Sequence, residues 1–401
     1  MKRINTLHIL ITGLALRLAW LLYARPVPVS DFKGYMDLAE VLLKTGQFGV
    51  HDPTAFRLPA YPAFLAAAMV LSKSVFWLSF LNILLSTVTV YLVYRLGTSL
   101  TGRREIGIIS GFLCALNPTY IFYSPLLASE HLYLPLLLLS FVLVSKSSIS
   151  RTVLAGASFG AAMLTRGEAL FLLPLFLVLV WMICRGSLSP AIALLAVIFV
   201  ITPWCIRNYR LTDGEVLLSS TGGINFYYAH NDKEAGWRPL DETPLAGKSD
   251  IEQNRLGYEL GMKYLKSAGV SGILIDIAKG TRNLFLTAPC YVTHWNSLAP
   301  SPGPEEGRTV RKLPGINYFC NLASLWYYAL LALTAASIFF IRRYPVKSRV
   351  MTYGLIFLIW VLYAAVLWGD ARYRYAAVTM FCILSAVSIR EIVNKWKESP
   401  N

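Results

Sequence analysis

Residues 189–206 read SPAIALLAVIFVITPWCI, a run of eighteen residues without a charged side chain. A helix of about 20 apolar residues crosses about 30 Å of hydrocarbon, the core of a membrane. This run therefore predicts a membrane-spanning helix. Further apolar runs along the chain predict nine more spans, at residues 4–24, 75–94, 106–124, 131–145, 152–165, 168–184, 316–341, 350–368 and 375–391.

The composition of the chain agrees with many membrane spans. Hydrophobic residues make up 56% of the 401 residues, charged residues make up only 15%, and the mean hydropathy is +0.53. A soluble globular domain has roughly 25% charged residues. The composition therefore excludes an ordinary soluble protein and predicts an all-α polytopic membrane protein with about ten transmembrane helices.

The formal net charge of +15 records membrane topology. Lys and Arg are spread along the chain without a basic tail or a basic helix face, which argues against a nucleic-acid partner. Short loops rich in Lys and Arg stay in the cytoplasm. With the N-terminus inside, the inner segments carry +12 and the rest of the chain carries +3. The charge pattern therefore predicts that both chain ends are cytoplasmic.

This topology divides the chain into three parts. The N-terminal membrane module, residues 1–206, includes a long first outer loop at residues 25–74. An outer soluble segment follows at residues 207–315, and residues 316–401 supply the C-terminal transmembrane helices and a cytoplasmic tail. Apolar spacing predicts two helices in the outer segment, at residues 251–266 and 270–285.

The first span has no signal-peptide cleavage site after it and is predicted to be an uncleaved anchor. Residues 152–184 either cross the membrane twice or form a re-entrant pair, because the first of these runs is shorter than roughly 17 residues. Cys290 and Cys320 lie outside or at the outer edge and could pair, but spacing alone does not fix a disulfide.

The first outer loop contains a candidate catalytic carboxylate. Apolar residues recur at helical spacing over residues 31–44, which predicts an amphipathic helix lying flat on the outer leaflet. Asp31 stands at its start. There the carboxylate either caps the helix by accepting backbone N–H groups, or faces the outer segments as a general base.

Two arginines near the outer face are candidate anion-binding groups. Arg57 precedes an apolar helix whose first turn contains Pro59 and Pro62. A guanidinium beside free helix N–H groups suits a phosphate, although a lipid headgroup contact fits the spacing equally well. Arg17 lies within the first span, where a charge is costly; it is either functional or extends to the outer headgroups.

Three short segments join spans at the outer edge and carry further charges. Glu130 joins spans three and four, Arg166 joins spans five and six, and Arg372 joins spans nine and ten. Taken singly, each suits ordinary helix capping or interfacial packing. Together with Arg207 at the end of span seven, they predict an outer surface of several arginines around a few carboxylates. Such a surface suits an anionic lipid substrate.

Read in order, these residues form a pattern that resembles bacterial members of the dolichyl-phosphate-mannose protein mannosyltransferase family. That family shares the GT-C glycosyltransferase fold with the lipid A aminoarabinose transferases. The pattern covers nearly the whole chain, and its elements are Arg17, Asp31, Tyr35, Ala39, Gly46, Arg57-x-Pro-x-Tyr61-Pro62, Ser129-Glu130, Leu164-Thr165-Arg166, Pro203-Trp204-x-x-Arg207-Asn208-Tyr209, Gly222-Gly223-Ile224-Asn225 and Arg372-Tyr373.

The resemblance implies a GT-C bundle that transfers a sugar from a polyprenyl-phosphate donor to a lipid, glycan or protein acceptor. It implies an active site on the outer or periplasmic face of the plasma or bacterial inner membrane. Asp31 would be the catalytic base, and Glu130 a second carboxylate that orients the acceptor or holds a divalent cation. The donor phosphate would meet arginines, from the set Arg17, Arg57, Arg166, Arg207 and Arg372.

The sequence departs from the family pattern at two positions. Phe32 stands where protein mannosyltransferases usually have Glu, which weakens the expectation of a protein acceptor, and Ala376 stands where Pro is frequent. Two other functions compete with sugar transfer. A transporter or flippase of an anionic lipid or glycan commonly has repeats and ionisable residues near mid-membrane, and a non-catalytic scaffold needs no isolated Asp among arginines.

Overall fold

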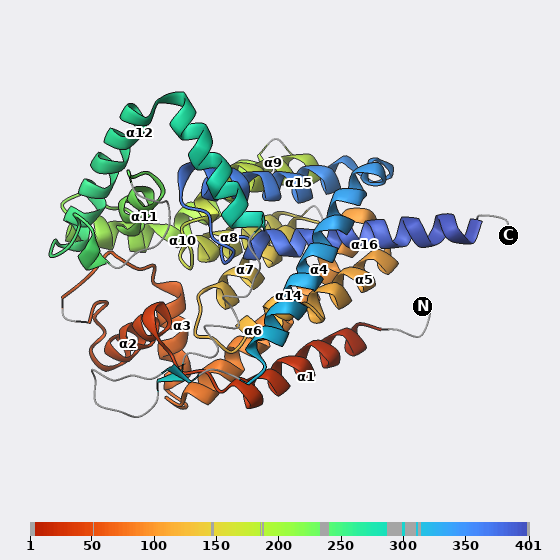
Figure 1. The fold of residues 1–401 in the computed structure, drawn as a ribbon, viewed down its shortest axis with the longest axis horizontal. Coiled ribbons are helices and arrows are strands. Elements are labelled where there is room, and N and C mark those ends of the chain that lie inside the picture. Colours follow the sequence, from red (N-terminus) through yellow and green to blue (C-terminus); the bar gives the residue numbers. More distant parts are fainter. Residues whose placement is uncertain are drawn as a thin grey trace.

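The computed structural model shows a helical bundle with a cap of outer segments at one end (Figure 1). It describes residues 5–50, 52–145, 148–184, 186, 188–232, 240–286, 299–300, 310–311 and 314–398. The N-terminal half contains ten helices within the described residues: α1 Thr6–Ala24, α2 Ser30–Thr45, α3 Ala60–Met69, α4 Val75–Thr101, α5 Arg104–Ala115, α6 Pro118–Tyr123, α7 Glu130–Val144, α8 Ile149–Met163, α9 Ala169–Cys184 and α10 Ser189–Leu211.

The remaining elements build the outer segment and the last part of the bundle. In the outer segment they are α11 Thr221–Ala229, η1 Leu240–Glu242, α12 Asp250–Thr281, η2 Arg282–Leu286 and the antiparallel pair β1 Ala299–Pro300 and β2 Val310–Arg311. In the bundle they are α14 Ile316–Ala336, η3 Ser337–Phe339, η4 Ile341–Arg343, α15 Val346–Trp360, η5 Val361–Val366 and α16 Tyr375–Glu398.

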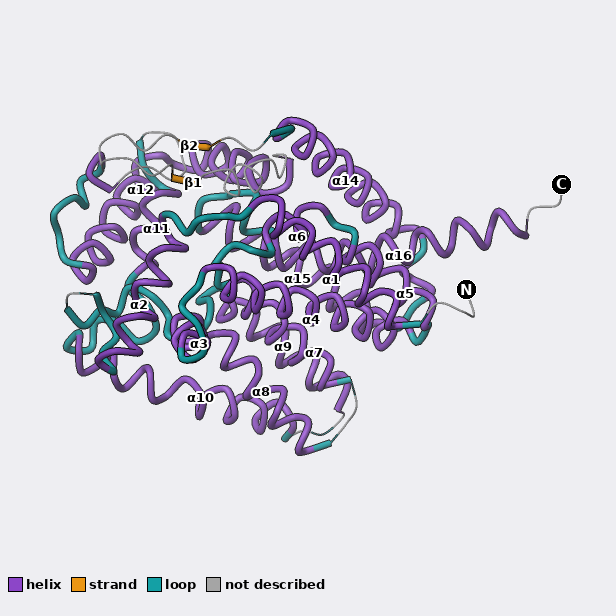
Figure 2. Tube along the Cα trace, turned by 90° about the horizontal axis from the view of Figure 1, so that it is seen from below, coloured by secondary structure: helices purple, strands orange, loops and turns teal. Residues whose placement is uncertain are grey.

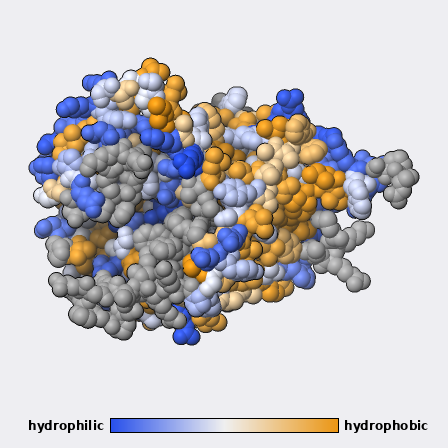
Figure 3. All heavy atoms as spheres, in the orientation of Figure 1, coloured by the Kyte–Doolittle hydropathy of each residue, from blue (hydrophilic) through white to orange (hydrophobic). Residues whose placement is uncertain are grey.

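The polytopic membrane architecture predicted from the sequence is confirmed. Six helices among the described residues are long and apolar enough to cross a membrane: Thr6–Ala24, Val75–Thr101, Ser189–Leu211, Ile316–Phe339, Val346–Val366 and Tyr375–Glu398. Shorter apolar helices accompany them at α3, α7 and α9. In Figure 3 the surface of the bundle is largely hydrophobic, whereas the end that carries α11 and α12 is more hydrophilic. The exact number of crossings stays a prediction.

The third predicted span is divided. α5 ends at Ala115 and α6 begins at Pro118. Proline cannot donate a backbone hydrogen bond to the preceding turn, and Asn117 caps the new helix by accepting the Thr119 backbone N–H at 3.0 Å. The break leaves carbonyl groups at the end of α5 without helical partners, which Arg17 uses, as described below.

Glycines set the close packing of α8 against α10. A Cβ atom at Gly156 would lie 2.3 Å from the carbonyl oxygen of Ala193, and one at Gly160 would lie 3.0 Å from Val200 Cβ. Small residues four apart allow two membrane helices to approach each other closely.

The turn between α8 and α9, which contains Arg166, reaches the same pocket as the start of α7. Whether residues 152–184 cross the membrane fully stays a prediction.

The two helices predicted in the outer segment are confirmed as the two arms of α12. The arms meet at Gly269, whose φ of 62° and ψ of −175° are open to glycine and costly for other residues. Figure 1 shows the two arms arching away from the bundle. α11 packs on the first arm, where a Cβ atom at Gly223 would lie 1.8 Å from the carbonyl oxygen of Asn254.

The chain ends and the outer segments lie at opposite ends of the bundle. α1 starts and α16 finishes at the same end, while α2, α11 and α12 gather at the other (Figures 1 and 2). α2 is the predicted amphipathic helix, and it buries Phe32, Tyr35, Leu38 and Ala39. Cys290 lies outside the described residues, so its pairing with Cys320 stays a prediction.

Candidate functional site

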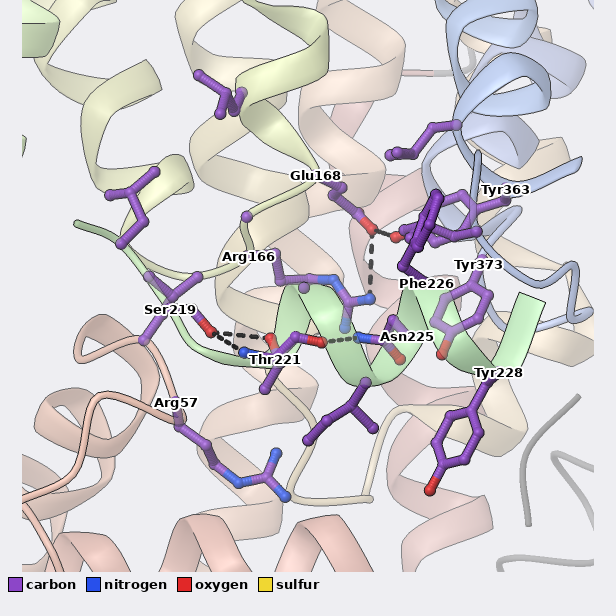
Figure 4. Close-up of a pocket in the computed structure, with 18 of the residues that line it drawn as sticks. Arg57, Arg166, Glu168, Ser219, Thr221, Asn225, Phe226, Tyr228, Tyr363 and Tyr373 are labelled. Carbon is purple, nitrogen blue, oxygen red and sulfur yellow. Dashed lines mark hydrogen bonds and ion pairs between the residues drawn. The ribbon is translucent and has the colours of Figure 1, made fainter. Parts of the chain in front are cut away.

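A pocket of about 580 Å³ lies between the bundle and the outer segments. Its walls come from α2, from the turns before α7 and α9, from α11 and α12, and from the stretch between η5 and α16. Figure 4 shows part of this lining. The charged residues in its wall are Asp31, Arg57, Arg166, Glu168 and Arg372. Segments more than 300 residues apart in the sequence therefore meet here.

Asp31 is held by two arginines. Its Oδ1 lies 2.6 Å from Arg57 Nη2, and its Oδ2 lies 3.2 Å from Arg372 Nη1. The helix begins at Ser30, its N-cap is Val29, and no side chain caps it. The N-cap interpretation of Asp31 is therefore wrong: the carboxylate sits one residue inside the helix and turns toward the arginines.

Glu130 is the most deeply buried carboxylate of the network. Its side chain is 2% exposed, against 41% for Asp31. Glu130 Oε1 lies 2.9 Å from Arg166 Nη1 and 2.6 Å from Arg372 Nε. A buried carboxylate needs such partners, because removing it from water costs several kcal/mol. Glu130 thus fixes the positions of two arginines that line the pocket.

The ion pairs continue to a carboxylate that the sequence analysis did not select. Arg166 Nη2 lies 3.3 Å from Glu168 Oε2, and the hydroxyl of Tyr363 donates a short hydrogen bond to the same oxygen. The network therefore runs in alternating sign through Arg57, Asp31, Arg372, Glu130, Arg166 and Glu168. Glu168 lies two residues after Arg166, so the sequence could have indicated that it belongs to the network. Its contact with Tyr363 could not be predicted in this way, because Tyr363 is almost two hundred residues away.

The electrostatics of Asp31 follow from these contacts. Burial alone would raise its pKa, but the charges of Arg57 and Arg372 and their hydrogen bonds outweigh burial and lower the pKa. The neighbouring Asp370 behaves differently. Burial raises the pKa of Asp370, although its carboxylate accepts the backbone N–H of Arg372 at 2.7 Å. Asp31 is therefore firmly ionised in this arrangement.

Aromatic rings hold the arginines in place. The Arg57 guanidinium carbon lies 4.7 Å from the centroid of the Tyr35 ring, and that of Arg372 lies 5.7 Å from the centroid of the Phe32 ring. Phe32, the residue that departs from the family pattern, is buried beneath Arg372. A ring at this position attracts the guanidinium without adding a third carboxylate to it.

Arg17 and Arg207 do not join the pocket. Arg17 is fully buried and donates to Gly13 O at 2.9 Å, Ala115 O at 3.1 Å and Ser86 Oγ at 2.8 Å. It thus satisfies carbonyl groups, including one at the broken end of α5. Arg207 donates to Thr54 O at 2.6 Å and Phe48 O at 3.1 Å, which ties the first outer loop to α10. The geometry assigns both arginines to structural contacts.

In the described part of the chain, the carboxylates of the network are each paired with arginines. Within the described residues, no group of three or more His, Cys, Asp or Glu side chains is arranged to hold a metal ion. Glu130 faces Arg166 and Arg372, and two guanidinium groups repel a cation. The arrangement favours anion binding, because guanidinium groups match the oxygens of a phosphate.

Comparisons with known proteins agree with this architecture. Residues 53–206 match the family model described as dolichyl-phosphate-mannose-protein mannosyltransferase. A structure of the oligosaccharyltransferase from Archaeoglobus fulgidus in complex with Zn and sulfate superposes with a TM-score of 0.56 at 13% identity, over 97% of this chain and 49% of that one. The chain has a GT-C glycosyltransferase fold.

A second structure with the GT-C fold is the archaeal oligosaccharyltransferase AglB from Archaeoglobus fulgidus in complex with an inhibitory peptide and a dolichol-phosphate. It has a TM-score of 0.52 at 11% identity, over 97% of this chain and 50% of that one. ArnT from Cupriavidus metallidurans bound to undecaprenyl phosphate also matches, with a TM-score of 0.46 at 12% identity, over 97% and 77%. The chain spans about half the length of the archaeal enzymes. No curated protein sequence matches it significantly.

Proposed function

We propose that the chain is an integral-membrane glycosyltransferase that moves a sugar from a polyprenyl-phosphate donor to an acceptor on the outer face of the membrane. The observation that carries this proposal is the pairing of Asp31 with Arg57 and Arg372 at the wall of the pocket. A partly exposed carboxylate between two arginines offers a base and an anion-binding group side by side. The family match and the GT-C fold support it.

The proposed reaction is a displacement at the anomeric carbon. Asp31 takes the proton of the acceptor hydroxyl, and the acceptor oxygen bonds to the anomeric carbon. The bond from that carbon to the phosphate oxygen breaks, and its electron pair leaves on the phosphate. The arginines stabilise the leaving charge. A hexose or a pentose fits this chemistry.

Charge balance indicates how the phosphate binds. The three arginines of the network face three carboxylates, so an entering phosphate must replace a carboxylate at one of them. The side chain of Asp31 is 41% exposed and that of Glu130 is 2% exposed, so Asp31 is the carboxylate that the phosphate displaces. Phosphate would then occupy Arg57 and Arg372 with Arg166 nearby, and the released Asp31 becomes more basic. Glu130 keeps Arg372 and Arg166 in position.

The proposed location of the site rests on charge and on the bundle. The basic inner loops support cytoplasmic chain ends, by the rule that short positive loops stay inside. The pocket lies at the other end of the bundle, so it would open at the outer face of the plasma or bacterial inner membrane. AglB, which shares the fold, has a structure in complex with a dolichol-phosphate; a polyprenyl-phosphate donor is proposed here on that similarity.

Sugar transfer by the purified protein tests the proposal. We expect radiolabelled sugar to move from mannosyl- or glucosyl-phosphoryl polyprenol to acceptors in a membrane extract, with loss of transfer in Asp31→Asn. A transporter or flippase would instead move the labelled lipid across a vesicle bilayer without cleaving the sugar–phosphate bond. Lipid movement without cleavage would reject the glycosyltransferase.

A further inference from the structure

One wall of the pocket is aromatic, and the exposed ring surfaces of Trp368 and Tyr373 in it have no role in the ion-pair network. The rings of Tyr363 and Tyr373 stack with their centroids 4.3 Å apart and their planes 4° apart. Trp368 meets Tyr373 edge to face at 5.1 Å. All three residues line the pocket. Tyr373 and Trp368 are partly exposed, so part of their surface remains open to the pocket.

Polar contacts and backbone packing hold this wall rigidly. Trp368 Nε1 donates to Asn225 Oδ1 at 3.4 Å, and Asn225 Nδ2 donates to the carbonyl of Thr221 at 3.0 Å. Beside Trp368, a Cβ atom at Gly369 would lie 2.2 Å from the carbonyl oxygen of Gly280. The loop is thus pressed against α12, and Trp368 is fixed between the bundle and α11. A rigid aromatic surface binds a ligand with little loss of conformational entropy.

The wall lies on the arginine side of the pocket. Tyr373 follows Arg372 in the sequence, and Tyr363 donates to Glu168, which pairs with Arg166. In Figure 4, Tyr363 and Tyr373 lie to one side of Arg166, and Arg57 lies to the other. A group attached to a phosphate at the arginines would therefore rest against the aromatic wall.

We propose that Trp368, Tyr373 and Asn225 form the subsite for the sugar of the lipid donor, and that this sugar is an uncharged pyranose. The inference rests on the proposed function. The C–H face of a pyranose packs against the electron-rich face of an aromatic ring. The amide of Asn225 has a donor and an acceptor with remaining capacity for sugar hydroxyls. The subsite residues carry no charge, and Glu168 beside them is already paired with Arg166 and Tyr363, so no free carboxylate lines the subsite to pair with an ammonium group.

Binding of matched lipids to the full-length protein in nanodiscs tests the subsite. The probes are mannosyl- and glucosyl-phosphoryl polyprenol, the sugar-free polyprenyl phosphate, and a polyprenyl phosphate that carries an amino sugar. We expect Trp368→Ala to weaken binding of a neutral-sugar lipid about tenfold and to leave the sugar-free lipid unchanged. Trp368→Phe keeps an aromatic face and should retain most of the affinity. Trp396→Ala, on the exposed end of α16, is the matched control.

Each outcome separates the subsite from the proposed function. Equal weakening of sugar-linked and sugar-free lipids by Trp368→Ala, with the thermal stability unchanged, would overturn the subsite. The subsite would also be overturned if neutral-sugar lipids bound the unmodified protein no more tightly than the sugar-free lipid does. If the amino-sugar lipid binds most tightly, the inference that the donor sugar is uncharged is wrong. If none of the lipids binds, the polyprenyl-phosphate donor fails, and the subsite falls with it.

Discussion

Asp31 Oδ1 and Arg57 Nη2 lie 2.6 Å apart, although the two residues are separated by 26 positions and by the turn between α2 and α3. Among the described residues of the first outer loop, only Asp31 and Arg57 bring a charged side chain to the wall of the pocket. Because Arg57 also lies over the Tyr35 ring, its guanidinium can stay in place when Asp31 leaves it.

Asp31→Asn should abolish the base and keep the fold. Asn has nearly the same shape, and Asp31 does not cap α2. A general base contributes roughly 10² to 10⁴-fold to rate, so turnover should fall at least about a hundredfold. Asp37→Asn on the exposed side of the same helix is the control, because Asp37 pairs only with Lys33 in the described structure. Near-normal turnover in a stable Asp31→Asn protein would remove Asp31 from the mechanism.

Arg57→Lys should weaken donor binding. Lysine keeps the positive charge but loses the planar fork that contacts two phosphate oxygens, and it stacks less well on Tyr35. Arg166→Lys should behave similarly, whereas Arg95→Lys, at an exposed arginine of α4, should not. Equilibrium binding of a polyprenyl-phosphate sugar measures the effect. Unchanged affinity in both pocket variants would contradict the assignment of these arginines to the phosphate.

Glu130→Gln should destabilise the protein more than Asp31→Asn does. It removes the buried counter-charge that Arg166 and Arg372 share and leaves each with one carboxylate, Glu168 or Asp31. Breaking a buried pair costs about 3–5 kcal/mol. Asp31 is more exposed, so solvent compensates for its loss. Thermal unfolding in detergent compares the two variants. A Glu130→Gln protein as stable as Asp31→Asn would show that Glu130 does not organise the network.

The lowered pKa of Asp31 predicts two different acid limits. A group whose pKa is lower in the folded than in the unfolded protein adds stability above its unfolded pKa, and this stability is lost as pH falls toward the folded pKa. The Asp31 contribution to stability should therefore persist through mildly acidic pH. In the donor complex Asp31 loses an arginine and its pKa rises. Turnover at saturating donor should fall at a higher pH than stability does; coincident limits would argue against displacement of Asp31 by phosphate.

The predicted topology can be checked by cysteine labelling of whole cells. Ser249 is exposed in the outer segment, and Ser150 is exposed in the first turn of α8, next to Arg151. After substitution by Cys, Ser249 should react with an impermeant reagent and Ser150 should not, because the positive-inside rule predicts that the basic loops are cytoplasmic. The unsubstituted protein gives the background. The reverse pattern would place the pocket on the cytoplasmic face.

Local properties of the sequence determined the membrane character of this protein and the positions of its helices, and they predict its sidedness. Apolar runs, basic loops and the helical spacing of residues 31–44 and 251–285 can each be read in a short window, because hydrophobicity and charge act on each segment separately. α2, the bundle helices and both arms of α12 follow these windows. The break before Pro118 is also a local property, because proline lacks the backbone N–H that would continue the helix.

Tertiary structure alone decided which charges meet. Arg17 lies within one apolar run and Arg166 lies between two others. Arg17 donates to a carbonyl at the broken end of α5, whereas Arg166 pairs with Glu130 and Glu168. Their difference depends on which helix ends lie beside each arginine, and the packing of distant segments sets that. The aromatic wall of Tyr363, Trp368 and Tyr373 likewise gains its partner Asn225 only when α11 folds over the bundle. Ion pairs and ring contacts act over a few ångströms, so they exist only after the chain has brought their members together.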